Sequence, residues 1–265
     1  MEQPCTPIGA LLRSWRGRRG FSQLALATEA EISQKHLSFI ESGRASPSRD
    51  MVLLLAEQLD VPLRDRNILL QAAGFAPVFR ERPLDDPALA PARAAIETVL
   101  RAHEPNPALV VNRHWDLVSA NAAVAPLLAG VDPELLKPPA NVMRIGLHPR
   151  GLAPLIVNLP EWRAHLLERL RRQYRATLDP ALDALLTELS AFDRGTGRAH
   201  PRDHRDDIVV PLKLRTQHGV LSFFGTVTVF GTPQEITLSE AVMECFYPAD
   251  AATADTMRRL VPRRD

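Results

Sequence analysis

Residues 33–39 carry side chains that are suited to reading the edges of DNA bases. Gln34 and Lys35 are followed within one helical turn by Ser38 and Phe39. Glutamine can form two hydrogen bonds to adenine, lysine can reach guanine O6 and N7 or a phosphate, and an aromatic ring can contact the thymine methyl group. On a helix these side chains would share one face, so the sequence predicts base contacts in the major groove of duplex DNA.

A second group of polar residues surrounds this stretch and is suited to the phosphate backbone. Its members are Gln23, Ser33, Arg44, Ser46 and Ser48. Polar side chains and the N–H groups at helix starts are frequent phosphate donors, and they fix the register of a protein on the duplex. We therefore expect this second group to position the first.

Five short helices are predicted to hold these side chains. Apolar residues from Ile8 to Ala73 recur three or four positions apart, and Gly or Pro separates the segments. Ser22 and Ser48 are suitable N-caps, and Ala25 is small enough to let two helices cross closely. The expected helices span residues 8–18, 22–28, 33–42, 49–59 and 63–73.

This region resembles the Cro/C1-type helix-turn-helix domain (Xre family) of bacterial and phage repressors. The resemblance is carried by the runs Ser22-Gln23-x-x-Leu26-Ala27 and Ile32-Ser33 … Ile40-Glu41-x-Gly43-Arg44. It implies sequence-specific DNA binding, and a five-helix bundle without DNA activity is the weaker alternative. Glu31 departs from the family, which usually has glycine at that turn; a positive φ there would cost about 1 kcal/mol.

Charge alone does not predict a nucleic-acid partner. The chain has 32 Lys and Arg against 31 Asp and Glu, and residues 1–80 carry 10 basic and 8 acidic groups, a net charge of +2. Non-specific binding to DNA should therefore be weak, and a homodimer is expected to supply much of the affinity for a palindromic operator.

Composition predicts a soluble protein of about two domains in a reducing cytosol, and the resemblance to bacterial repressors implies the bacterial cytoplasm, with association to the nucleoid when the protein is bound to DNA. The 265 residues include two cysteines, and 45% of the residues are hydrophobic. The sequence has no run of about 18 apolar residues that is free of charged residues, and its first residues lack the pattern of a signal peptide. Neither a membrane nor a disulfide framework is indicated.

A proline-rich segment at residues 75–91 predicts a linker between a domain at residues 1–74 and one at residues 92–265. The amphipathic stretch 92–103 is expected to pack on the second domain or against a second subunit, and the sequence leaves both open. Asn121 is a suitable N-cap for a helix ending at residue 128. Further helices are expected at residues 159–174 and 180–192, and strands at residues 108–112, 115–120, 207–215 and 220–230.

The second domain resembles the C-terminal ligand-binding domain of MmyB-like transcription regulators. The resemblance is carried by residues 107–121 (PALVVNRHWDLVSAN), 141–144 (NVMR), 156–162 (IVNLPEW), 221–226 (LSFFGT) and 246–250 (FYPAD). It implies a fold of class α + (α+β): a five-helix Cro/C1-type bundle joined to a PAS-like α+β domain with an antiparallel sheet. It also implies a small apolar effector that is held between the sheet and the helices, and a fatty-acid-like molecule is the best-supported class.

Several bulky residues are candidates to contact such an effector. Trp115, Trp162, Phe223 and Phe224 could line an apolar cavity, and Arg144 could meet a carboxylate at its mouth. The alternatives are that the aromatic residues are simple core and that Arg144 pairs with a nearby acid. Four arginines at positions 169, 171, 172 and 175 are expected on a solvated helix face, with a second phosphate contact as the weaker alternative.

Catalytic and metal motifs give little support to an enzyme. The sequence lacks GxSxG, HExxH and Walker patterns, so no enzyme, metal or cofactor is expected. His200 and His204 with Asp206 and Asp207 have helical spacing, but Pro201 favours an exposed loop over a zinc site. Two rival functions remain: a regulator switched by a protein partner through a purely dimerising second domain, and an enzyme fused to a DNA-targeting domain.

Overall fold

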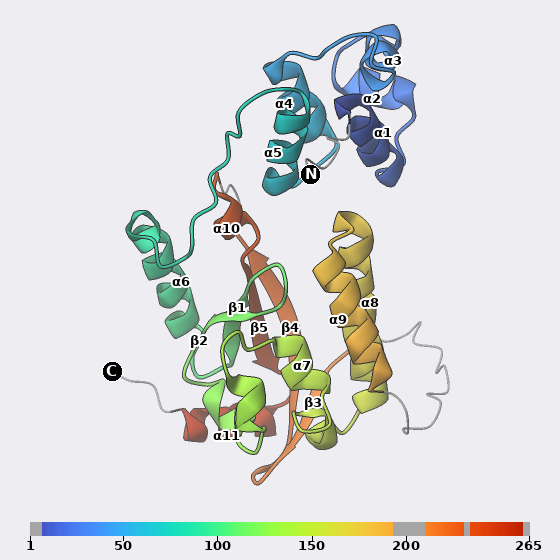
Figure 1. Ribbon diagram of the computed structural model, residues 1–265. Helices are drawn as coiled ribbons and strands as arrows, with labels where there is room; N and C mark the ends of the chain where they lie inside the picture. The colour runs from blue at the N-terminus through green and yellow to red at the C-terminus, as the bar shows by residue number, and fades with distance from the viewer. Residues whose placement is uncertain (1–6, 193–209, 231–233, 262–265) are drawn as a thin grey trace. The chain divides into compact units, whose positions relative to one another are not determined.

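The computed structural model describes residues 7–192, 210–230 and 234–261 (Figure 1). Contacts divide the chain into two units. One comprises Met1–Leu84 together with Gly231–Ser239, and the other comprises Asp85–Phe230 with Glu240–Asp265. We call them the helical unit and the sheet unit. The division at Leu84 lies inside the segment predicted as a linker, whereas no local pattern in the sequence predicts that residues 234–239 join the helical unit.

The helical unit contains five N-terminal helices close to the predicted ranges. They are α1 (Ile8–Arg18), α2 (Gln23–Glu29), α3 (Gln34–Glu41), α4 (Arg49–Gln58) and α5 (Leu63–Ala72). Ser22, Ser33 and Ser48 cap α2, α3 and α4, because each hydroxyl accepts the backbone N–H three residues later at 3.0–3.2 Å. The core between the helices is apolar and includes Leu12, Trp15, Leu26, Leu37, Ile40, Leu55 and Leu70.

Two predictions concern α2 and the turn that follows it. Glu31 has φ 52°, so it does adopt the left-handed conformation that its position suggested. Ala25, in contrast, is exposed; the small residue that is buried on α2 is Ala27, with 1% of its surface accessible. The prediction that Ala25 lies at the helix crossing is therefore wrong, and the error is one half-turn of helix.

The beginning of the predicted linker is fixed to α5. The side-chain oxygen of Asn67 accepts the N–H groups of Val78 and Phe79 at 2.9 and 3.1 Å, and its amide donates to the Phe79 carbonyl at 2.7 Å. Arg64 forms an ion pair with Glu81. Residues 78–81 are thus a bound strand-like segment rather than a free tether.

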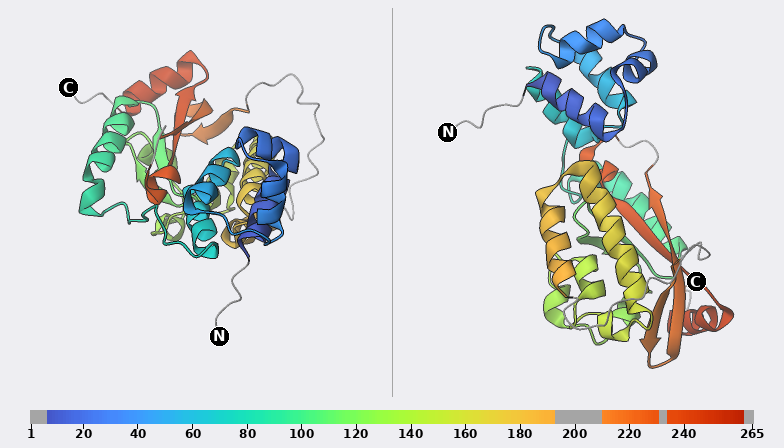
Figure 2. Two further views of the ribbon diagram at one scale, coloured as in Figure 1. Left: turned by 90° about the horizontal axis from the view of Figure 1, so that it is seen from above. Right: turned by 90° about the vertical axis from the view of Figure 1, so that its right-hand side faces the viewer.

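The sheet unit is built on a five-stranded antiparallel sheet with strand order β2-β1-β5-β4-β3. Figures 1 and 2 show α6 and α11 on one face of this sheet and α7, α8 and α9 on the other. The strands are β1 (Ala108–Val111), β2 (Leu117–Ala120), β3 (Leu212–Thr216), β4 (Gly219–Val229) and β5 (Val242–Pro248). The α-helices of the unit are α6 (Ala90–Ala102), α7 (Val142–Leu147), α8 (Leu159–Thr177), α9 (Pro180–Ala191) and α11 (Ala251–Leu260).

Short elements complete the described chain. The 3-10 turns are η1 (Pro87–Leu89), η2 (Ala125–Leu128), η3 (Pro133–Leu136) and η4 (Ala153–Leu155). The four-residue helix α10 (Ile236–Ser239) precedes β5 and belongs to the helical unit. Residues 207–209 of the predicted third strand lie outside the described residues, and β3 begins at Leu212.

The structure settles two expectations for the sheet unit. Ile96 and Leu100 of α6 are 2% and 3% exposed, so the amphipathic helix packs on this unit. Asn121 is not an N-cap, and residues 125–128 form a 3-10 turn instead of an α-helix. Asn121 is buried and joins three segments: its oxygen accepts the Ala108 N–H at 3.1 Å, and its amide donates to the carbonyls of Leu100 and Asn106 at 3.1 and 2.8 Å.

Candidate functional site

Helix α3 presents a polar face away from the core. Leu37 and Ile40 are 0% exposed and fix the inner side of the helix. The four residues predicted to contact bases lie elsewhere on α3: Gln34 and Lys35 are exposed, and Ser38 and Phe39 are half-buried. The helix therefore keeps all four at or near the surface of the helical unit.

Two positive charges lie close to the ring of Phe39. The Nζ atom of Lys35 is 5.6 Å from the centroid of the Phe39 ring, and the Cζ atom of Arg44 is 5.8 Å from it. Both distances are within the range of cation–π attraction, which helps to order long side chains at a surface. The arrangement combines an apolar contact surface with two cations, one on α3 and one just after it.

The residues predicted to contact phosphates surround α3 but differ in exposure and in hydrogen bonding to the rest of the protein. Arg44, Ser33, Ser46 and Ser48 are exposed. Gln23 is half-buried, and its amide donates to the Oε2 atom of Glu41 at 2.8 Å. The first residue of α2 is thus held in a defined orientation beside the end of α3.

Glu41 is the buried acceptor that connects α1, α2 and α3. Its side chain is 0% exposed, and it receives two hydrogen bonds from Arg16, at 2.6 Å from Nε and 2.9 Å from Nη2. Arg13 lies 3.5 Å away. Burial acts to raise the pKa of the Glu41 carboxyl, but the hydrogen bonds from Arg16 and Gln23 outweigh it, so the pKa is lowered and the carboxylate stays ionised.

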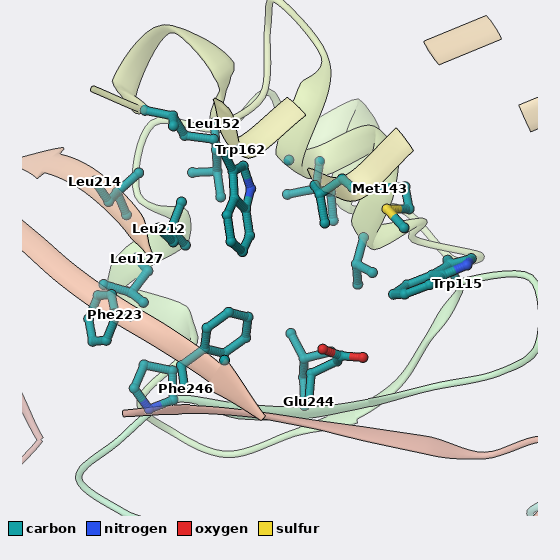
Figure 3. Close-up of a pocket in the computed structure, with 18 of the residues that line it drawn as sticks. Trp115, Leu127, Met143, Leu152, Trp162, Leu212, Leu214, Phe223, Glu244 and Phe246 are labelled. Atoms are coloured by element: carbon teal, nitrogen blue, oxygen red, sulfur yellow. The ribbon is translucent and has the colours of Figure 1, made fainter. Parts of the chain in front are cut away.

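A cavity of about 640 Å³ lies in the sheet unit between the sheet and helices α7 and α8 (Figure 3). Its walls are largely apolar. Met143 of α7 and Trp162 of α8 contribute from the helices, whereas Phe223 of β4 and Phe246 of β5 contribute from the sheet. This volume falls within the usual range of about 300–1,000 Å³ for small-molecule sites.

The predicted effector contacts divide between the cavity and other places. Trp115, Trp162 and Phe223 line the cavity. Phe224 points to the opposite face of the sheet, where its ring stacks on Tyr247 at a centroid distance of 5.3 Å. Arg144 is not among the lining residues, because its guanidinium forms an ion pair with Glu188 at 2.8 Å. The sequence left two roles open for Arg144, contact with an effector carboxylate and an ion pair with a nearby acid. The structure shows the ion pair.

Sequence reasoning missed the polar group at the cavity. Arg169 of α8 and Glu244 of β5 both line it and form a bidentate ion pair, with side chains 23% and 10% exposed. The Arg169 guanidinium lies 4.6 Å from the ring centroid of Trp115, whose own φ is 69°. Arg169 was expected on a solvated face; Glu244, which comes from an unpredicted strand, explains why it is not.

Helix spacing was the available signal for this group. His165, Arg169 and Arg172 recur at i, i+4 and i+7 on α8, and all three line the cavity. Arg172 is exposed and forms no ion pair with another of the described residues. Burial, followed by the neighbouring charges of Arg169 and Arg172, lowers the pKa of His165, which keeps its ring neutral at neutral pH. The cavity therefore has one polar side in an otherwise apolar wall, formed by the Arg169–Glu244 ion pair, neutral His165 and the positive charge of Arg172.

Comparison with known families matches both units. Residues 92–260 match the MmyB-like transcription regulator ligand binding domain, and residues 12–65 match a helix-turn-helix family. The chain belongs to the MmyB-like transcription regulators. It is a DNA-binding transcription regulator with a ligand-binding domain, as its sequence predicted. A search of curated proteins found no match to this MmyB-like regulator.

The described residues of this MmyB-like regulator lack two other features. No helix among them has the length and apolar character needed to cross a membrane. They contain no cluster of three or more side chains that could hold a metal ion. His200, His204, Asp206 and Asp207, the weak zinc candidates, lie outside the described residues.

Proposed function

We propose that this MmyB-like regulator binds a palindromic operator as a homodimer through α3, and that an amphipathic, fatty-acid-like effector in the cavity changes its affinity for that operator. The observation that carries the DNA-binding half is the outward polar face of α3, where Lys35 and Arg44 both lie near the ring of Phe39. A dimer that places two such helices on the same side of DNA would read half-sites about 34 Å apart. The regulator would act in the bacterial cytoplasm.

On this proposal the four polar or aromatic side chains of α3 select the sequence. Gln34 and Lys35 project from the first turn, which is the part of a recognition helix that reaches base edges. Ser38 and Phe39 lie one turn later. Contacts to phosphate would come from Gln23, Ser33, Arg44, Ser46 and Ser48.

The effector half rests on the character of the cavity. Its apolar walls suit an alkyl chain, and the five-stranded antiparallel sheet beneath it suits the PAS-like fold that we expected. Arg172 at the edge and Arg169 deeper inside would attract an acidic head group. The proposed contacts are therefore Trp115, Trp162 and Phe223 for the chain of the effector and these two arginines for its carboxylate.

The DNA-binding half is tested by selecting operators from random DNA with the full chain and measuring affinities for the selected fragment. Gln34→Ala and Lys35→Ala should each weaken binding by about 1–3 kcal/mol and relax specificity at one position. Gln71→Ala removes an exposed glutamine of α5 and serves as the matched control, which should bind like the wild type. Equal operator affinity in all four proteins would exclude α3 as the reading element.

The effector half is tested by native mass spectrometry of the purified chain and by titration with dodecanoate and dodecan-1-ol. Co-purification of a small lipid, or micromolar binding of dodecanoate, supports the proposal. Absence of both, together with a protein captured through the second domain, would favour the regulator that responds to a protein partner. Hydrolysis of an acyl ester by the full chain would favour the fused enzyme.

A further inference from the structure

The connection between β4 and β5 contains a segment that belongs to the helical unit, although both strands belong to the sheet unit. Residues 234–239 include α10 and come directly before Glu240, Ala241 and the start of β5. We call residues 234–239 the arm. Its position in the chain gives the helical unit a second covalent attachment to the sheet, in addition to the linker after Leu84.

The arm is hydrogen-bonded to the first part of that linker. The carbonyl of Arg80 accepts the N–H of Ile236 at 2.9 Å, and the carboxylate of Glu235 accepts the N–H of Arg82 at 2.7 Å. The hydroxyl of Thr237 donates to the Arg82 carbonyl. Ile236 is 2% exposed, and α10 lies against α5. The arm is therefore packed and bonded, not a loose loop.

The same linker residues are held from the other side by α5. Asn67 binds the backbone at residues 78 and 79, and Arg64 pairs with Glu81. Residues 78–82 thus lie in a clamp between α5 and the arm. Any displacement of the arm must either break these bonds or move the linker against the last of the five N-terminal helices.

At its other end the arm leads straight into the cavity wall. Two residues separate α10 from β5, whose Glu244 and Phe246 line the cavity. Glu244 is the cross-strand partner of Val227, another lining residue, so the ladder next to the arm is part of the wall. Arg113, beside the lining residue Trp115, lies 3.9 Å from Glu240 at the exit of the arm.

We propose that the arm transmits occupancy of the cavity to the DNA-binding helices, and that Glu235 and Thr237 are the positioning residues of this route. The inference rests on the proposed function and adds the route by which effector binding reaches the DNA-binding helices. An acidic effector that competes with Glu244 for Arg169 would shift β5, and the arm would carry the shift to residues 78–82. Coupling of this kind requires hydrogen bonds that differ between the effector-free and the effector-bound protein. The bonds between the arm and residues 80–82 would be the ones that differ.

The test compares two double variants of the full chain. Glu235→Ala with Thr237→Val removes the carboxylate acceptor and the hydroxyl donor. Glu235→Gln with Thr237→Ser is the matched control, because it keeps an acceptor oxygen and a hydroxyl donor at these positions. Operator affinity is measured by fluorescence anisotropy without and with saturating dodecanoate, and dodecanoate affinity is measured separately by calorimetry. In the wild type the operator affinity should change roughly 5–150-fold on saturation.

The quantity compared is the ratio of the operator affinities measured with and without saturating dodecanoate. In the Ala/Val variant this ratio should fall to within about twofold of one, while the affinity for operator alone and the affinity for dodecanoate alone stay near those of the wild type. The Gln/Ser control should keep the wild-type ratio. An undiminished ratio in the Ala/Val variant overturns the inference and leaves the proposed function intact.

Failure of the proposed function has a different signature, because the wild type then fails to bind operator or dodecanoate in its own titration, or binds operator equally well with and without dodecanoate. If the double substitution impairs folding, Thr237→Val alone is used, since it removes one hydrogen bond. A reduced ratio in that single variant supports the inference, and an unchanged ratio contradicts it.

Discussion

Arg16 of α1 reaches the buried carboxylate at the end of α3, with its Nε atom 2.6 Å from Oε1 of Glu41. The pair fixes the C-terminal end of the helix that we propose for base contacts, and Gln23 completes it at the start of α2. Because Glu41 is inaccessible to water, the orientation of α3 depends on a charge that is satisfied by protein groups alone.

Replacing Glu41 by Gln should destabilise the helical unit by about 2–3 kcal/mol, because Arg16 then loses its charged acceptor in a buried setting. Unfolding is followed in urea with Trp15 fluorescence, in a background where Trp115 and Trp162 are replaced by Phe. Glu57→Gln changes an exposed glutamate of α4 and is the control. A loss as small as that of the control would show that the pair contributes little.

The same pair predicts how stability depends on pH. The pKa of Glu41 is lowered from its ordinary value of 4.5, so the unfolded chain takes up the proton first as the pH falls. The contribution of Glu41 is fully present above pH 4.5 and is lost as the pH falls through the folded-state pKa. The difference in unfolding free energy between wild type and Glu41→Gln should therefore shrink below that pH, and a constant difference would contradict the assignment.

Glu31→Gly should stabilise the helical unit by about 0.5–1 kcal/mol. Glycine adopts the observed φ of 52° without the steric cost of a side chain, although it adds entropy to the unfolded chain. Glu29→Gly, which places glycine in the last position of α2, should have the opposite sign. Thermal unfolding of the two variants decides the point, and a destabilised Glu31→Gly protein would argue for an unrecognised contact of the Glu31 side chain.

Arg172→Ala should weaken the binding of dodecanoate by roughly tenfold and leave that of dodecan-1-ol unchanged, because the arginine is proposed to attract the carboxylate and not the alkyl chain. Arg175→Ala is the matched control: it lies on the same helix, its side chain is 70% exposed, and it does not line the cavity. Calorimetric titration of both ligands separates the outcomes. Equal losses for acid and alcohol would place Arg172 in a packing role.

The helical unit could be predicted from sequence almost to the residue because its signals are local. Ser22, Ser33 and Ser48 mark helix starts, and apolar spacing marks the inner faces. Ala25 was misplaced because small residues occupy both sides of α2, and composition does not distinguish them. The strained turn at Glu31 was foreseen from a departure in the family pattern.

The sheet unit was less predictable because its decisive contacts are long-range. Asn121 looked like a helix cap, but its polar groups are satisfied by backbone groups of Leu100, Asn106 and Ala108, which precede it by 13 to 21 residues. Strand β5 was not predicted, so the partner of Arg169 was missed, and Arg144 was considered for a role at the cavity mouth. Nothing local marked residues 234–239 as part of the helical unit, since their bonds join positions about 150 apart.

The central strand of the sheet is also the last one to be synthesised. β5 pairs with β1 on one side and β4 on the other, so before residue 242 leaves the ribosome the nascent chain can form two separate hairpins but no sheet. Helices α1–α5 have all their mutual contacts more than a hundred residues earlier. During translation the five N-terminal helices can therefore pack together well before the sheet can close, and α10 reaches α5 only just before β5 is made.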